Sequence, residues 1–269
     1  MVTKEQLLNW KVLKKSEGEI FATNAFVLLT SDFFPFSKIQ CALFKGNDRD
    51  LFDKKEYCGP LYEQIEAAYQ FVLRHINRSA EIEGLVRKDV YELPVGAIRE
   101  MIINAVCHRN FMDNSCVQVA IYDNRVEVTS PGMLFGGLTL EEAMNGRSKI
   151  RNRAIAETFS RMELIEAWGT GIRRILRRAN EYGLPTPEFM EIGDTFRVNL
   201  YKKADKKFER QQLIIEYLQR EESVSNREAR AILGLAESTT KRILKQMVQD
   251  EILSESGQRK GKRYFLKKK

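Results

Sequence analysis

Long apolar runs, clustered histidines and paired cysteines are all missing from this chain of 269 residues. No run of about 18 apolar residues occurs, so the sequence predicts no membrane span, and the first six residues contain no apolar signal core. The two histidines and four cysteines show no CxxC pairing and no spacing typical of zinc ligands. We therefore expect reduced thiols, a cytoplasmic location and no zinc site.

Positive charge is concentrated at the C-terminal end. The formal net charge is +7, with 44 Lys/Arg against 37 Asp/Glu. Residues 205–269 hold 16 Lys/Arg and 10 Asp/Glu, whereas the first 204 residues hold 28 and 27. This imbalance predicts that the last quarter of the chain, rather than the whole protein, meets a polyanion.

Apolar periodicity divides the first 201 residues into helices and strands. Helices are expected at 60–78, from Pro94 to about 109, from the N-cap Thr139, from the N-cap Asn152 to about 161, and from about 168 to 182. Strands are expected at 24–30, 38–45, 117–122, 125–129, 188–192 and 195–201. This order predicts an α+β chain whose first domain (1–201, core about 21–201) is an α/β sandwich, a mixed sheet with helices on one face.

Three polar side chains recur every fourth residue in the helix expected at 98–109. At about 3.6 residues per turn, Glu100, Asn104 and His108 fall on one side of that helix. A carboxylate and a carboxamide beside an apolar stripe can hold a water or a metal at the rim of a pocket. A solvated polar face explains the same spacing equally well.

A Gly-Thr-Gly turn at 169–171 marks another expected helix start. Free backbone N–H groups and the helix dipole favour phosphate at such a place. Arg147, Lys149 and Arg151 precede the turn and supply positive charge for phosphate. A tight strand-to-helix turn is the competing explanation.

The order of these features resembles the GHKL ATPases, the group of gyrase, Hsp90, MutL and the histidine kinases. The resemblance is closer to one branch, the RecG-like, Schlafen-associated transcriptional regulators. Three segments carry it: Ile98–Arg109, Ser130-Pro-Gly132 leading to Gly136-Gly-Leu-Thr139, and Arg147–Asn152 followed by Trp168-Gly-Thr-Gly-Ile172. It covers most of residues 10–201. An AlbA-like domain often comes first in this branch, and we expect this chain to begin where that domain would end.

The resemblance implies roles by position. Glu100 matches the glutamate that activates the attacking water, and Asn104 matches the asparagine that binds the magnesium of the nucleotide. The glycines of the 169–171 turn match a glycine box that touches phosphates, and residues 133–168 would form the lid. The set that the resemblance implies for ATP and magnesium is Asn104, His108, Gly132, Arg147, Lys149, Gly169, Thr170 and Gly171.

One departure from the family pattern concerns adenine. The first glycine box of the family reads Asp-x-Gly-x-Gly, and its aspartate accepts the adenine amino group, whereas this chain has Ser130 at that place. A serine hydroxyl is a weaker, uncharged acceptor. We therefore expect poor adenine selectivity and no productive ATP hydrolysis, because a loosely held nucleotide is poorly positioned. A GxxxxGK[ST] loop is also missing, which excludes a P-loop helicase motor.

Residues 208–269, after a charged linker at 202–207, are typical of a winged helix-turn-helix. Helices are expected at 208–220, 226–233 and 237–250, with Ser225 as a cap and Gly234 as a stop, followed by a hairpin at 252–266. The third helix would enter a major groove, and the hairpin would contact phosphates or the minor groove. The predicted DNA-binding side chains are Ser238, Thr239, Lys241, Arg242, Lys245, Arg259, Lys260, Lys262 and Arg263. A protein-interaction module with a solvated basic rim is the alternative.

These features favour one function and leave two alternatives. The favoured function is a transcriptional regulator that binds double-stranded DNA as a homodimer, with the ATPase-like domain as a sensor or dimerisation body. The first alternative is a GHKL-type enzyme that hydrolyses ATP with Glu100 while acting on DNA. The second is a protein-interaction module without nucleotide.

Overall fold

The computed structural model describes residues 2–32, 34, 36–45, 50–83, 86–165, 169–203, 206–257 and 261–267. The chain divides into two compact units, Met1–Lys203 and Ala204–Lys269, and each has its own hydrophobic core. Among the described residues, no helix combines the length and the apolar character that crossing a bilayer requires.

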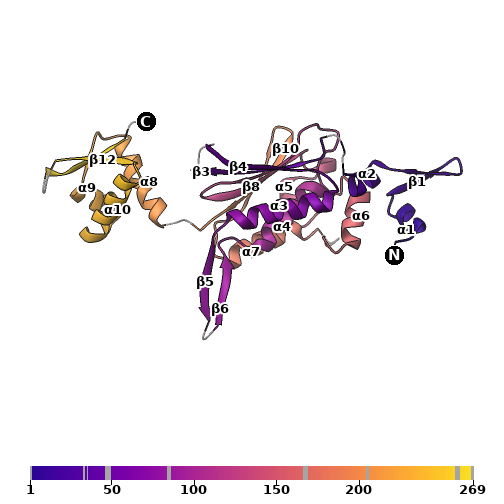
Figure 1. Ribbon diagram of the computed structural model, residues 1–269, viewed down its shortest axis with the longest axis horizontal. Coiled ribbons are helices and arrows are strands. Elements are labelled where there is room, and N and C mark those ends of the chain that lie inside the picture. Colours follow the sequence, from indigo (N-terminus) through magenta and orange to yellow (C-terminus); the bar gives the residue numbers. More distant parts are fainter. Residues whose placement is uncertain are drawn as a thin grey trace. The chain divides into compact units, whose positions relative to one another are not determined.

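A six-stranded mixed sheet forms the centre of the first unit (Figure 1). Its order is β4-β3-β7-β8-β10-β9, and only the β3–β7 pairing is parallel. The strands are β3 (Ile39–Lys45), β4 (Asp50–Tyr57), β7 (Val117–Ile121), β8 (Arg125–Pro131), β9 (Glu188–Ile192) and β10 (Thr195–Tyr201). The predicted α+β class and the mixed sheet are thereby confirmed.

Helices cover one face of this sheet, as Figure 1 shows. Helices α3 (Leu61–His75) and α4 (Val95–Cys107) pack on the sheet, and α7 (Gly171–Glu181) packs against α4. The shorter helices are α1 (Lys4–Asn9), α2 (Asn24–Thr30), η1 (Phe135–Gly137), α5 (Leu140–Met144) and α6 (Arg153–Arg161). Two hairpins complete the unit: β1 (Leu13–Ser16) with β2 (Glu19–Ala22), and β5 (Arg78–Glu83) with β6 (Val86–Tyr91).

Alternating side chains of the predicted 117–129 hairpin form the floor of the core. Val117, Val119 and Ile121 of β7 and Val126 and Val128 of β8 are all buried, as their period of two predicts. The apolar stripe of α3 that faces them is buried as well and comprises Leu61, Ile65, Ala68, Phe71 and Val72. Burial of these two apolar faces against each other is what holds the helices on the sheet.

Two local predictions for the first unit are wrong. The apolar run 24–30 was expected as a strand, but it forms helix α2, which begins after an extended Thr23 and buries Leu28 and Leu29. Asn152 precedes α6 but its side chain does not cap that helix. Instead its Nδ2 donates to the carbonyl oxygens of Cys107 and Arg109, at 2.9 and 2.8 Å, and so ties α6 to the end of α4.

The second unit contains three helices and a small sheet. The helices are α8 (Lys206–Leu218), α9 (Asn226–Leu233) and α10 (Glu237–Gln249), and the sheet has the order β11 (Val224–Ser225), β13 (Arg263–Leu266), β12 (Leu253–Ser256). Ser225 forms the expected capping box with Glu228, and Gly234 ends α9 at φ 63°. The predicted helix-turn-helix with a C-terminal hairpin is confirmed.

Candidate functional site

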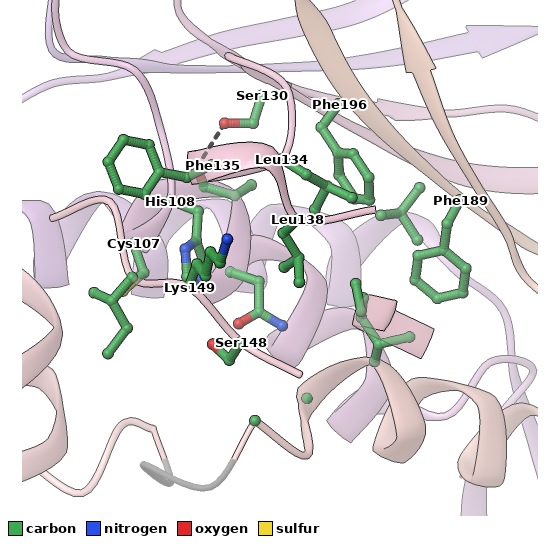
Figure 2. Close-up of a pocket in the computed structure, with 18 of the residues that line it drawn as sticks. Cys107, His108, Ser130, Leu134, Phe135, Leu138, Ser148, Lys149, Phe189 and Phe196 are labelled. Carbon is green, nitrogen blue, oxygen red and sulfur yellow. Dashed lines mark hydrogen bonds between the residues drawn. The ribbon is translucent and has the colours of Figure 1, made fainter. Parts of the chain in front are cut away.

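A cavity of about 160 Å³ opens between α4, β8 and the start of α7 (Figure 2). Ser130 at the end of β8 lies on its wall. The cavity is also lined by most of the predicted nucleotide-site residues, namely Glu100, Asn104, His108, Gly132, Arg147, Lys149, Gly169 and Gly171. Thr170 does not line it, and Trp168 lies outside the described residues. Two segments far apart in the sequence therefore meet around one hollow.

Glu100 is held by two neighbours. Its Oε2 lies 3.2 Å from Nη2 of Arg174 on α7, and its Oε1 accepts a 3.1 Å hydrogen bond from Nδ2 of Asn104. The side chains of Glu100 and Arg174 are only 7% and 17% exposed. A general base must be able to take a proton, and protonation of Glu100 would break a buried ion pair. The carboxylate is therefore poorly placed to activate water.

Gly171 brings the backbone of α7 directly against this pair. A Cβ at Gly171 would lie 2.5 Å from Glu100 Oε1 and 2.8 Å from Asn104 Nδ2, so any larger residue would force these two side chains to move. Gly171 is the first residue of α7, where free N–H groups and the helix dipole offer positive charge. The carboxylate of Glu100 thus lies next to the first residue of α7.

The cations that were expected to neutralise phosphate contact other groups. Arg147 forms an ion pair with Glu142, which is itself at the start of α5. The Nζ of Lys149 donates to the carbonyl oxygen of Gly136 at 2.5 Å. Arg151 donates to two backbone carbonyl oxygens, at 3.0 and 2.6 Å. Lys149 and Arg151 are thus bound to neutral carbonyl groups, and only Arg147 of the three pairs with a carboxylate.

The remaining polar groups of the cavity are neutral. Ser130 is buried, and its Oγ donates to the carbonyl oxygen of Ala105 at 2.7 Å, so its oxygen can only accept from a ligand. Burial, with the nearby charge of Arg151, lowers the pKa of His108 and keeps its imidazole uncharged at neutral pH. Burial raises the pKa of the Cys107 thiol to about 12, so this thiol is not a nucleophile.

These residues fit magnesium and ATP hydrolysis poorly. Asn104 offers one amide oxygen, and the neighbouring carboxylate of Glu100 is already paired. Within the described ranges, no three His, Cys, Asp or Glu side chains come together as a metal site. Magnesium in such a site also takes ligands from the nucleotide phosphates, so magnesium binding, nucleotide binding and hydrolysis stay predictions.

A second candidate site is the exposed face of α10. Ser238, Lys241, Arg242 and Lys245 are exposed and Thr239 is half-buried, while Ile243, Leu244 and Met247 face the core. Arg263 begins the return strand of the hairpin and Lys262 directly precedes it, whereas Arg259 and Lys260 lie outside the described residues. The predicted cations of α10 therefore share one solvent-facing surface.

Acidic partners of these cations were not anticipated. Lys241 Nζ lies 2.6 Å from Oε1 of Glu237, one turn earlier on α10, and Lys262 Nζ lies 2.7 Å from Oε2 of Glu255 on β12. The i,i+4 spacing of Glu237 and Lys241 was a visible sequence signal. Two of the predicted DNA-binding lysines are therefore paired with carboxylates in the free protein.

Comparisons with known families decide the domain types. Residues 114–200 match the family model described as "Putative ATP-dependent DNA helicase recG C-terminal", and residues 208–254 match the model described as "Winged helix-turn-helix DNA-binding". The chain joins a RecG-type HATPase-like domain to a DNA-binding winged helix. This is the pairing that the sequence motifs predicted. The first match begins after α4, so the roles of Glu100 and Asn104 are not covered by it.

A solved structure has a fold similar to that of this chain. The crystal structure of the DIP2311 protein from Corynebacterium diphtheriae superposes with a TM-score of 0.65 at 20% sequence identity. The match covers 98% of this chain and 57% of that one, so this chain spans little more than half the length of that protein. At this identity the likeness shows the fold alone. No curated protein matches this chain.

The Glu100–Arg174 pair predicts a large and specific stability effect. Arg174→Met should lower the free energy of unfolding by about 3–5 kcal/mol, because it leaves a buried carboxylate without its partner. Adding Glu100→Gln should recover part of this loss, so the double variant should be more stable than the sum of the single losses predicts. Urea unfolding followed by circular dichroism measures both effects.

Arg177→Met is the matched control for this experiment. Arg177 lies on the same helix but is 66% exposed and forms a surface pair with Glu181. Its replacement should cost about 1 kcal/mol or less. Equal losses for the Arg174 and Arg177 variants would contradict a buried, structural pair.

Proposed function

We propose that this protein is a transcriptional regulator that binds double-stranded DNA through α10 and the β12–β13 hairpin, with the HATPase-like domain acting as a sensor or dimerisation body. The observation that carries the proposal is the closed Glu100–Arg174 pair in a domain attached to a DNA-binding winged helix. Such a domain keeps the cavity of an ATPase-like fold but not its general base. A site of this kind is suited to sensing a ligand rather than consuming it.

Charge and geometry support DNA as the partner of the second unit. Helix α10 follows the turn after α9, as the second helix of a helix-turn-helix does, and its exposed face carries Lys241, Arg242 and Lys245. Neutralising phosphates with such side chains releases counterions and supplies sequence-independent affinity. The residues at the start of α10, Ser238 and Thr239, are the ones that would approach base edges.

ATP hydrolysis is the second candidate function, and one observation favours it. Glu100, Asn104, Gly169 and Gly171 surround one cavity, as the resemblance to the GHKL ATPases implies. Turnover would require Glu100 to leave Arg174 before it could accept a proton. A protein-interaction module without nucleotide is the third candidate, and it assigns no role to the exposed cations of α10.

The DNA-binding face predicts a change in salt dependence. Lys241→Ala combined with Arg242→Ala should weaken binding and reduce the slope of log K against log salt by about 2, since each lost phosphate contact contributes about 0.9. Fluorescence anisotropy on a duplex selected from a random library measures both. Lys14→Ala with Lys15→Ala removes the same charge from exposed positions of the first unit and should leave the slope unchanged.

Glu237→Gln should act in the opposite direction in the same assay. It removes a negative charge from the DNA-facing surface and frees Lys241, so binding should strengthen at low salt. An unchanged slope in the Lys241/Arg242 variant would count against α10 as the contact surface.

The closed state of Glu100 predicts that ATP is not turned over. With magnesium and ATP, wild-type protein and Glu100→Ala should release phosphate at the same background rate in a malachite-green assay, with and without DNA. Circular dichroism checks that the variant is folded. Phosphate release by the wild type that disappears in Glu100→Ala would establish the ATPase function instead.

Recognition of two half-sites predicts a homodimer. Size-exclusion chromatography with light scattering should give twice the chain mass of 31.2 kDa at the concentrations at which DNA is bound. A monomer mass both free and on a selected duplex would remove dimerisation from the proposal.

A further inference from the structure

The walls of the HATPase-like cavity are mostly apolar. Phe189 and Phe196 lie together at one end, and His108 and Lys149 lie at the other, as Figure 2 shows. Aliphatic side chains, including Leu138 and Ile175, complete the apolar end. Binding of an apolar ligand against such a wall is favourable, because it removes apolar surface from water. Phe135 lies on the side of His108, so aromatic side chains line both ends of the cavity and the polar groups are at one of them.

Among the described residues that line the cavity, Lys149 is the cation that donates to a carbonyl oxygen, and the nearby Arg151 donates to carbonyl oxygens as well. The charged lining residues of the cavity are Glu100, Arg147 and Lys149. Glu100 is balanced by Arg174, and Arg147 by Glu142. Lys149 rests on a carbonyl oxygen rather than on a carboxylate. A ligand carboxylate at Lys149 would replace this neutral contact by a charged one.

The size of the cavity points in the same direction. Its volume of about 160 Å³ gives room for roughly ten waters, which corresponds to a ligand of about a dozen non-hydrogen atoms. A nucleoside triphosphate has more than twice that number. Ser130 and uncharged His108 at the polar end offer hydrogen-bonding atoms without adding charge.

We propose that this cavity binds a small organic monocarboxylate with an apolar, ring-sized body, and that it does so without magnesium. The carboxylate would pair with Lys149, and the body would lie between Phe189 and Phe196. The inference rests on the proposed sensor function and names its class of effector. Recognition requires only the exchange of the Gly136 carbonyl for the ligand carboxylate at Lys149 Nζ, and no bond is made or broken.

The test compares two probes that differ only in charge. Isothermal titration of the full chain with 4-phenylbutyrate in the presence of EDTA should give saturable binding. The uncharged analogue 4-phenylbutan-1-ol should bind about tenfold more weakly, because it lacks the charge-assisted contact. Magnesium ATP at the same concentration should bind more weakly than 4-phenylbutyrate.

Charge-removing variants locate the site. Lys149→Gln should lower the affinity for 4-phenylbutyrate about tenfold, to that of the alcohol, and leave the affinity for the alcohol unchanged. Lys14→Gln removes the same charge at an exposed position of β1 and should change neither affinity. Lys149 is exposed, so its replacement should not unfold the protein.

Three results would overturn the inference: no binding of 4-phenylbutyrate, equal binding of acid and alcohol, or magnesium-dependent binding of ATP that is tighter than that of the acid. DNA binding by the same samples separates this inference from the proposed function. If DNA binding is intact and any of those three results is obtained, the carboxylate inference fails but the regulator proposal stands. If the wild type does not bind DNA, the regulator proposal itself fails, regardless of the result with 4-phenylbutyrate.

Discussion

The ion pair between Glu100 and Arg174 is the contact on which the site depends. It joins α4 to α7, whose close approach is possible because Gly171 has no side chain to place between them. A buried ion pair adds little net stability compared with an apolar contact of the same shape, but loss of one partner is costly. The pair therefore adds a specific polar link to the apolar packing of α4 against α7.

The same contact determines what chemistry the cavity can support. The carboxylate of Glu100 is bound to Arg174 and to the amide of Asn104, next to the start of α7. The cavity beyond these groups has mostly apolar walls, and Lys149 lies at its opening. On the proposed function, the partner of a single glutamate is what distinguishes this domain from an active ATPase. Fold likeness alone does not assign function, and here the site argues for a different use of the same architecture.

Local signals in the sequence predicted most of the elements that surround the site. The 117–129 hairpin, the capping boxes at Thr139 and Ser225, and the left-handed Gly234 are all governed by near neighbours in the chain. The failures occurred where distant contacts decide. The 24–30 run is short and apolar, so periodicity cannot separate strand from helix, and Asn152 serves the end of α4 instead of its own helix. Strand β4 is charged and largely exposed, so it carries no apolar alternation to detect.

The site was predictable in its parts but not in its pairing. Fourfold spacing placed Glu100 and Asn104 on one side of a helix, and the Gly-Thr-Gly turn marked a close approach, but α7 carries four arginines and the sequence alone does not say which one meets Glu100. Packing decides this, because burial of Ile175 and Ala179 turns Arg173 and Arg177 to solvent and keeps Arg174 near the interface.

A second glycine gives a general signal. A Cβ at Gly96, in the first turn of α4, would overlap the guanidinium of Arg178, so each of the two helices begins with a glycine that makes room for a charged side chain of the other. Glycine near the start of both members of a helix pair is thus a sequence mark of close, charge-bearing packing, which a reading of each helix by itself does not reveal.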